Sequence, residues 1–154
     1  MKNLIIGLTV LTTSSLANAV PNFWTNADYQ GYDIYIINDS KGQTLSINCN
    51  YASSDNADHG VYLTVNNKDY SNSDSSYPLS FLVNDSIVAE PSGTTKWRGG
   101  SEKWYTFTSA ITKAKKIEIY YKERKISTII PKNPTLVKSL AKCKSMSDRP
   151  KIGG

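Results

Sequence analysis

Short segments in which apolar and polar residues alternate recur along most of the chain. Such alternation places the apolar side chains on one face of a β-strand. Segments with this pattern cover residues 32–38, 43–50, 61–65, 79–83, 87–90, 104–107, 116–121 and 125–130. Turn-forming clusters of Gly, Asn, Asp and Ser separate them. Seven or eight short strands at regular spacing predict an all-β fold, an antiparallel β-sandwich of one domain.

A different pattern follows the last predicted strand. Asn133 is a good N-cap residue, and Pro134 suits the first position of a helix. Leu136, Leu140 and Cys143 then fall at positions i, i+4 and i+7, on one side of a helix. The pattern predicts a short C-terminal helix that packs through this side.

The chain has two cysteines, Cys49 at the end of one predicted strand and Cys143 at the end of the predicted helix. In an exported chain, an even pair of cysteines is most simply a disulfide. It would close the sandwich and restrict the unfolded chain by roughly 4–5 kcal/mol on the chain-entropy model. Two cysteines and a single histidine, His59, do not make a convincing structural zinc site, and no cofactor is expected.

The N-terminus has the three parts of a secretory signal peptide. Lys2 precedes an apolar run over residues 4–11, and Ala17-Asn18-Ala19 matches the small-x-small cleavage rule. The run is shorter than the ~20 apolar residues of a membrane span. We therefore expect a signal peptide over residues 1–19, a domain over 20–145 and a mobile tail over 146–154. The expected location is periplasmic or secreted, with no stable membrane insertion after cleavage.

Charge is distributed unevenly. Residues 20–109 contain five Lys and Arg against ten Asp and Glu, whereas residues 110–154 contain twelve against three. Two interpretations stay open: the basic half steers association with an acidic partner or an anionic membrane face, or the lysines simply solvate outer strand faces and the helix surface. Nucleic acid is not an expected partner, because the chain is exported and contains no recognisable binding motif.

The inventory of reactive side chains argues against catalysis. His59 is the only histidine and lies in a polar loop over residues 53–60, where a solvated side chain is typical. The chain lacks a nucleophile elbow, and its acidic residues are scattered over turns. Asp55, Asn56 and Asp58 lack the spacing and the closing Glu of a calcium loop. The sequence predicts no catalytic residue and no metal site.

One stretch, residues 96–104, combines side chains that are typical of binding hot spots. We expect partner contacts from Trp97, Arg98, Lys103 and Trp104, presented by a loop that Gly99 and Gly100 make adaptable. The alternative for Trp104 is that it begins a strand and fills the core. The alternative for Trp97 is that it covers an edge of the sandwich.

Three features occur in a similar order in small exported bacterial β-sandwich proteins. They are a strand over 45–49 that ends in Cys49, a hairpin over 81–90 followed by Trp97, and a lysine-bearing strand pair leading to a helix that ends in Cys143. In this respect the chain resembles the type VI secretion-associated VasI-like family. The resemblance implies a disulfide-closed sandwich and a secretion-associated accessory role.

These observations predict a non-catalytic, exported, protein-binding domain. It would serve as a secretion-associated accessory or as an immunity or inhibitor protein. The alternative is a carbohydrate-binding or peptidoglycan-binding module that uses surface tryptophans, and a more remote alternative is a hydrolase.

Overall fold

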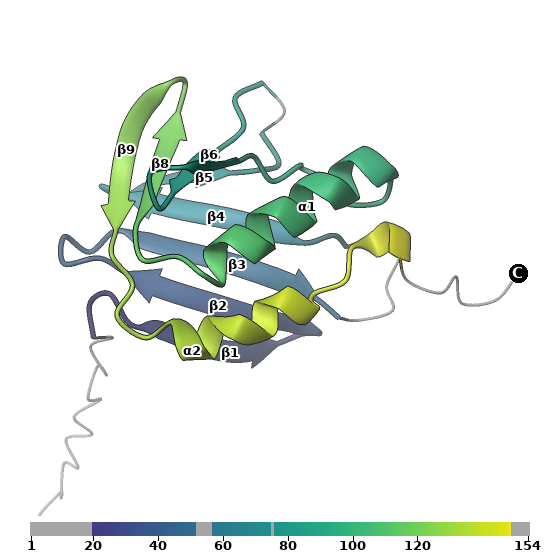
Figure 1. Ribbon diagram of the computed structural model, residues 1–154, viewed down its shortest axis with the longest axis horizontal. Helices are drawn as coiled ribbons and strands as arrows, with labels where there is room; N and C mark the ends of the chain where they lie inside the picture. Colours follow the sequence, from purple (N-terminus) through teal and green to yellow (C-terminus); the bar gives the residue numbers. More distant parts are fainter. Residues whose placement is uncertain (1–19, 52–56, 75, 149–154) are drawn as a thin grey trace, which may run out of the picture.

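The computed structural model describes residues 20–51, 57–74 and 76–148. These residues form nine strands, two α-helices and two short 3-10 helices (Figure 1). The predicted signal peptide over 1–19 and most of the predicted tail, 149–154, lie outside the described residues. None of the helices that the structure describes is long and apolar enough to cross a membrane.

The first half of the chain folds into a five-stranded antiparallel sheet in which neighbours in sequence are neighbours in space. Its strands are β1 (Trp24–Tyr29), β2 (Tyr32–Asn38), β3 (Thr44–Asn50), β4 (Gly60–Val65) and β5 (Lys68–Ser71). Strand β5 lies within residues 66–77, where clustered Ser, Asn and Asp predict a long turn. Asn66 and Asn67 precede it with φ of 50° and 59°, the left-handed pair that a tight two-residue hairpin requires.

The second half forms a four-stranded antiparallel sheet in the order β7-β6-β8-β9. Its strands are β6 (Ser80–Val83), β7 (Ile87–Ala89), β8 (Ile117–Tyr121) and β9 (Arg124–Ile129). Both of its hairpins were expected from sequence. Asn84 and Asp85 have positive φ at the first turn, and Lys122 and Glu123 have positive φ at the second.

Helix α1 (Arg98–Ile111) corrects the prediction of a strand over residues 104–107. Trp, Tyr, Thr and Phe favour strands when taken singly, and two glycines at the start weaken a helical pattern. The buried positions nevertheless have helical spacing, since Trp104, Phe107, Thr108 and Ile111 fall at i, i+3, i+4 and i+7. Burial of this face against the core overrides the local strand preference.

The C-terminal segment is helical, as predicted, but in two pieces: α2 (Pro134–Val137) and a 3-10 helix, η1 (Lys138–Lys142). The tighter 3-10 winding changes which residues face inward. Val137 and Leu140 are buried, whereas Leu136, expected on the packed side, is 37% exposed. After Cys143, a further one-turn 3-10 helix, η2 (Met146–Asp148), occupies the first positions of the predicted tail.

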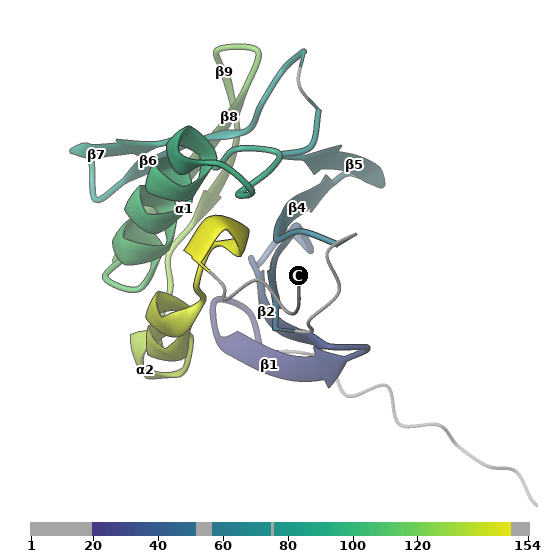
Figure 2. The same ribbon diagram turned by 90° about the vertical axis from the view of Figure 1, so that its right-hand side faces the viewer.

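The two sheets and the helices share one hydrophobic core (Figure 2). In Figure 2, α1 lies beside the four-stranded sheet, and the C-terminal segment lies between α1 and the five-stranded sheet. Ring contacts reflect this arrangement, because Phe107 of α1 packs on Phe81 of β6 at 4.9 Å between centroids. The predicted class is confirmed: the fold is mostly β, with two antiparallel sheets, a short C-terminal helix and a closing disulfide.

Candidate functional site

The predicted disulfide is present and connects the five-stranded sheet to the C-terminal segment. Cys49 lies in β3 and Cys143 follows η1, with 5.9 Å between their Cα atoms. Both cysteines are buried. The bond spans 94 residues of sequence, so it closes most of the described chain into one loop.

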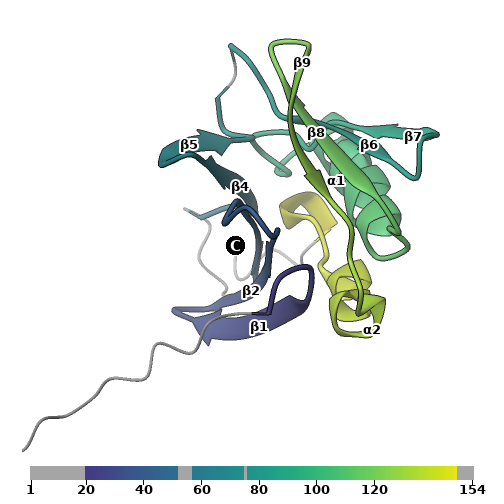
Figure 3. The same ribbon diagram turned by 90° about the vertical axis from the view of Figure 1, so that its left-hand side faces the viewer.

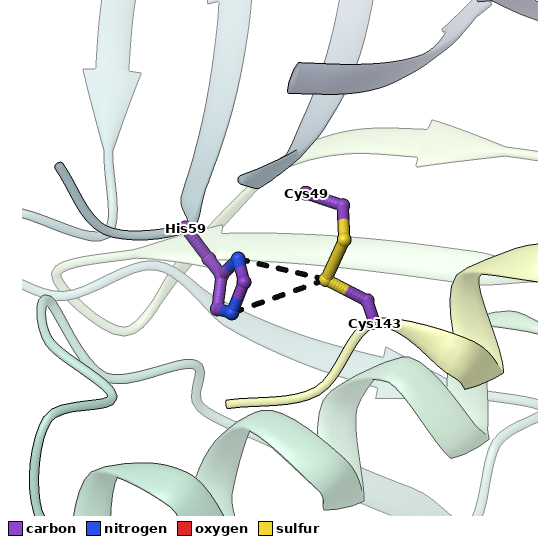
Figure 4. Close-up of side chains that lie close together, drawn as sticks. All are labelled: Cys49, His59 and Cys143. Atoms are coloured by element: carbon purple, nitrogen blue, oxygen red, sulfur yellow. Dashed lines mark hydrogen bonds between the residues drawn. A yellow bond between two sulfur atoms is a disulfide. The ribbon is translucent and has the colours of Figure 1, made fainter. Parts of the chain in front are cut away.

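His59 lies directly against this disulfide (Figure 4). Its two ring nitrogens are 3.5 and 3.9 Å from the sulfur of Cys143. The ring also stacks on Trp104, with 4.6 Å between centroids and 11° between planes. The expectation of a solvated loop histidine is wrong, since His59 is only 4% exposed.

Two hydrogen bonds define the protonation state of His59. The backbone N–H of Asn50 donates to Nδ1 at 3.0 Å, so Nδ1 acts as an acceptor. Nε2 lies 2.9 Å from the carbonyl oxygen of Lys144, which can only accept, so Nε2 carries the proton. This is the neutral imidazole, with both nitrogens engaged in holding chain segments together. A general base needs a free lone pair, which this arrangement does not offer.

Cys49, His59 and Cys143 are also the group of potential metal ligands that the described residues bring together, with ligand atoms within 4.8 Å of one another. Metals bind cysteine as the thiolate. In the structure both sulfurs are joined to each other, and the imidazole nitrogens have hydrogen-bond partners. In this state the cluster links β3, the start of β4 and the C-terminal segment.

Asp58, next to this cluster, binds the loop that precedes α1. Its carboxylate accepts hydrogen bonds from the hydroxyl of Thr94 at 2.8 Å and from the backbone N–H and hydroxyl of Thr95 at 2.8 and 2.6 Å. The N–H of His59 adds a fourth bond at 2.7 Å. Burial by itself raises the pKa of Asp58, but the hydrogen bonds outweigh it and hold that pKa below its ordinary value.

The same loop is also held from the C-terminal side. The backbone N–H of Met146 donates to the hydroxyl of Thr95, and that of Ser147 donates to its carbonyl, both at 3.0 Å. Thr95 is completely buried as a result. These contacts define the path of the chain two residues before Trp97, at the point where α1 begins.

The four residues predicted to contact a partner do not share one environment. Trp97 precedes α1 and is 63% exposed, and the side chain of Arg98 is 93% exposed and pairs with Glu102 at 2.9 Å. Lys103 is also exposed. Trp104 is completely buried, and its indole N–H donates to the carbonyl of Cys143 at 3.2 Å. The prediction of a contact role for Trp104 is therefore wrong, because Trp104 faces the core.

A surface hollow of about 430 Å³ adjoins Lys103. Two loops form its walls, one between β5 and β6 and the other between β7 and α1. Besides Lys103, its lining residues are Asn72, Ser73, Asp74, Pro78, Glu90, Pro91, Ser92, Gly93 and Thr94. The lining combines polar and apolar surface in similar shares and carries both signs of charge.

Sequence reasoning missed the part that Asp58 and Thr95 play. Asp58 was considered only as a calcium ligand together with Asp55 and Asn56, which lie outside the described residues. Its carboxylate oxygens instead bind hydroxyl and N–H donors. The available signal was weak: an acidic residue directly before a histidine, and a Thr-Thr pair shortly before a helix.

Comparison with known proteins gives a family. The sequence model of the YfjT family matches residues 22–136. The uncharacterised protein YfjT of Escherichia coli strain K12 is 31% identical over 121 residues, which cover 77% of each chain. The uncharacterised protein YkfB of the same strain is 30% identical over 122 residues, covering 77% of this chain and 78% of YkfB.

No solved structure matches the chain. The VasI-like resemblance gains no support from these matches. The family match begins just before β1 and ends within α2, so it includes both sheets and α1. The chain belongs to the YfjT family.

Proposed function

We propose that the chain is an exported, non-catalytic domain that binds a protein partner through the exposed residues Trp97, Arg98 and Lys103, termed here the α1 surface. One observation carries this proposal. Trp24 and Trp104 are buried in the core, whereas Trp97 is 63% exposed at the start of a well-anchored helix. A large aromatic side chain left in solvent beside an arginine has the composition of a binding hot spot.

The surroundings of Trp97 favour binding with little reorganisation. The chain leading to it is held by Asp58 on one side and by Met146 and Ser147 on the other, through bonds to Thr95. Side chains held on a rigid element lose less conformational freedom on association than side chains of a loose loop. The neighbouring hollow beside Lys103 offers a recess for a partner's side chain.

Export is supported by the disulfide and by the N-terminal sequence pattern. Disulfides persist in oxidising compartments, and the buried Cys49–Cys143 bond is integral to the core. A periplasmic or secreted location is therefore part of the proposal. Both a secretion-associated accessory, the role implied by the VasI-like resemblance, and an immunity or inhibitor protein are compatible with a protein-binding surface.

A glycan-binding module is the second candidate, because a sugar ring can stack on an exposed tryptophan. Trp97 would have to serve alone, since the other two tryptophans are buried. The charged neighbours Arg98, Glu102 and Lys103 favour a protein partner instead. Absence of catalysis is proposed on the grounds that both nitrogens of His59 hold backbone groups.

Affinity capture tests the proposal. The exported chain, with its disulfide formed, is immobilised and exposed to envelope extract of its own host, beside the Trp97→Ala variant. Tyr62→Ala serves as a matched control, because Tyr62 is an exposed aromatic residue on a different element, β4. We expect one protein to be retained by the wild type and by Tyr62→Ala. Loss of a hot-spot tryptophan should weaken its binding about 30-fold or more.

The other outcomes separate the candidates. A partner retained equally by Trp97→Ala would contradict the assignment of the α1 surface. Retention of peptidoglycan alone, lost with Trp97→Ala, would favour the glycan-binding module. Equal losses in both variants would mean that capture depends on exposed aromatic residues in general and not on this surface.

A further inference from the structure

The four outer edges of the two sheets differ in how well they are protected against pairing with another strand. A bare edge strand presents unpaired N–H and C=O groups, and short length, lysine or irregular pairing suppresses association. Strand β7 has three residues, β5 has four and begins with Lys68, and β9 carries Arg124 and Lys125 and pairs irregularly with β8. Strand β1 has six residues in regular register with β2 and carries neither lysine nor proline.

Asn133 shows which backbone groups of β1 point outward. Its side-chain oxygen accepts the N–H of Trp24 at 2.6 Å, and its side-chain nitrogen donates to the carbonyl of Trp24 at 3.1 Å. The groups of Trp24 therefore point away from β2, and by the two-residue period of a strand so do those of Asn26 and Asp28. In the described part of the chain, no hydrogen bond is made by the backbone N–H and C=O groups of Asn26 and Asp28, the four outward groups that Asn133 does not reach.

Asn133 thus does not cap α2, the role expected from sequence, but occupies the place of a neighbouring strand at one end of β1. The remaining residues, 25–29, are all exposed, and Tyr29 is 61% exposed. Figure 3 shows β1 along the border of the five-stranded sheet, with α2 beside one part of it. The open stretch is long enough for a short two-stranded ladder.

We propose that this stretch pairs with β1 of a second copy of the chain, in an antiparallel, two-fold symmetric dimer centred on Ala27. In this register Asn26 lies opposite the partner's Asp28, and the two exchange backbone hydrogen bonds. The equivalent pair lies on the other side of the axis. The amide of Asn26, which donates to the carbonyl of Ile34 at 3.5 Å, then faces a carboxylate that already accepts the hydroxyl of Tyr51 through one oxygen, at 2.6 Å, and has its other oxygen to offer. The small side chains of Ala27 meet at the axis. Thr25 lies opposite the partner's Tyr29, whose exposed ring it covers.

Two neighbouring registers are unfavourable, one because of the hydrogen bonds of Asn133 and the other because of the charge of Asp28. A register centred on Asn26 would place the partner's Asp28 beside Trp24, where Asn133 already forms both outward hydrogen bonds. A register centred on Asp28 would oppose two carboxylates directly, which is destabilising. The complementary order of Asn26 and Asp28 about Ala27 therefore specifies an identical strand as the partner. This proposal concerns a different element from the α1 surface and stands independently of it.

Engineered cysteines test the register. The chain is expressed from its first residue in an exporting host and purified with its native disulfide. Across the axis, the paired Ala27 residues would have Cα atoms about 4.5 Å apart, within reach of a disulfide. The two Thr25 residues would be more than about 13 Å apart. We expect Ala27→Cys to give a covalent dimer under mild oxidation, and Thr25→Cys, on the same exposed strand, to stay monomeric.

Sedimentation velocity on the unmodified chain gives the second measurement. We expect a concentration-dependent dimer that Asn26→Pro abolishes and Asn26→Ala retains, because only proline removes the outward N–H. At a concentration low enough that both variants are monomeric, thermal unfolding of Asn26→Pro should match that of Asn26→Ala, since this N–H does not pair with β2. A chain that stays monomeric up to millimolar concentration would overturn the proposal. So would equal cross-linking through Thr25→Cys and Ala27→Cys, or a dimer unaffected by Asn26→Pro.

Discussion

At the scale of single residues, Asp58 shows how one carboxylate organises a surface that it does not itself form. It accepts four hydrogen bonds, three of them from Thr94 and Thr95. The ionised carboxylate accepts all four bonds, whereas protonation turns one oxygen into a donor and removes the charge that strengthens the others. The position of the chain before Trp97 is therefore tied to the protonation of a residue far away in the sequence.

This dependence predicts a specific effect of pH on stability. The pKa of Asp58 in the folded chain lies below its ordinary value, because hydrogen bonds outweigh the effect of burial. At pH values between the folded and the unfolded pKa of Asp58, the carboxyl group is protonated in the unfolded chain and ionised in the folded chain. The free energy of unfolding therefore decreases as the pH is lowered. The contribution of Asp58 is complete above the unfolded pKa of about 3.9 and is lost as pH falls through the folded value.

The variant Asp58→Asn isolates this contribution. At neutral pH we expect it to lower the free energy of unfolding by about 1–3 kcal/mol, the range for disrupted charge-assisted bonds. In urea titrations over an acidic pH series, the difference from wild type should shrink as pH falls. Asp69→Asn is the control and should show little change, because Asp69 is exposed on β5 and accepts one side-chain hydrogen bond, from the hydroxyl of Thr64 at 2.7 Å. A difference that stays constant down to low pH would contradict the argument.

The residue scale is also where the sequence was least informative. It offered Trp97 and Trp104 as contact residues, with a place in the core as the alternative for Trp104, and helical phase decides that Trp97 is exposed and Trp104 buried. It placed His59 in a polar loop, but the sulfur that His59 contacts lies 84 residues later. Burial created by contacts so distant in sequence has no local signature.

At the scale of elements, α1 begins with two glycines whose surroundings differ sharply. A β-carbon added at Gly99 would meet no atom within 4 Å. A β-carbon added at Gly100 would lie 2.0 Å from the backbone oxygen of Thr94, a position with no flexible atom to give way. Gly100 therefore permits the close approach of α1 to the loop that Asp58 holds, whereas Gly99 has no such role.

The two alanine substitutions should act in opposite directions. Gly99→Ala should stabilise the chain by about 0.5–1 kcal/mol, the difference in helix propensity at an exposed position. Gly100→Ala should destabilise it by about 1–3 kcal/mol, because overpacking forces the helix or the loop to move. Each value comes from urea unfolding monitored by circular dichroism. Equal effects from the two variants would mean that the loop does not pack tightly on the start of α1.

The elements that sequence predicted well share a feature. The connections of the β6–β7 and β8–β9 hairpins each contain two successive residues with positive φ. In the first hairpin these residues are Asn84 and Asp85, types that are typical of turns in a sequence. Helix α1 was missed because its strand-favouring side chains obscured the helical spacing of Trp104, Phe107 and Ile111. Strand β5 was missed because its polar residues lack an apolar alternation, although Asn66 and Asn67 signal the turn before it.

At the scale of the whole molecule, the disulfide was predictable and its surroundings were not. Two cysteines in a chain with a signal-like N-terminus leave one intramolecular pairing. The sequence does not show that His59 contacts the disulfide. Nor does it show that Met146, shortly after Cys143, donates a hydrogen bond to Thr95. The C-terminal segment thereby connects the five-stranded sheet to the start of α1.

This connection leads to a prediction for the variant in which Cys49 and Cys143 are both replaced by alanine. The bond spans 94 residues, and loss of so long a loop should lower the free energy of unfolding by about 4–5 kcal/mol on the chain-entropy model. Urea unfolding at neutral pH measures this value. This loss is a large fraction of the 5–15 kcal/mol typical of the free energy of unfolding of a domain, so the variant is expected to be marginally stable.

Hydrogen exchange on the same variant distinguishes local from global loosening. Without the disulfide, we expect the largest gain in exchange over residues 134–148 and in the Thr94–Trp97 loop, because Met146 and Ser147 hold that loop through Thr95. The ladder between β8 and β9 contains neither cysteine and should keep more of its protection. The α1 surface would then lose its rigid base, and partner binding should weaken although Trp97 and Arg98 are unchanged. A uniform rise in exchange over all strands would instead mean that the disulfide stabilises the domain as one unit, with no specific link from Cys143 to the start of α1.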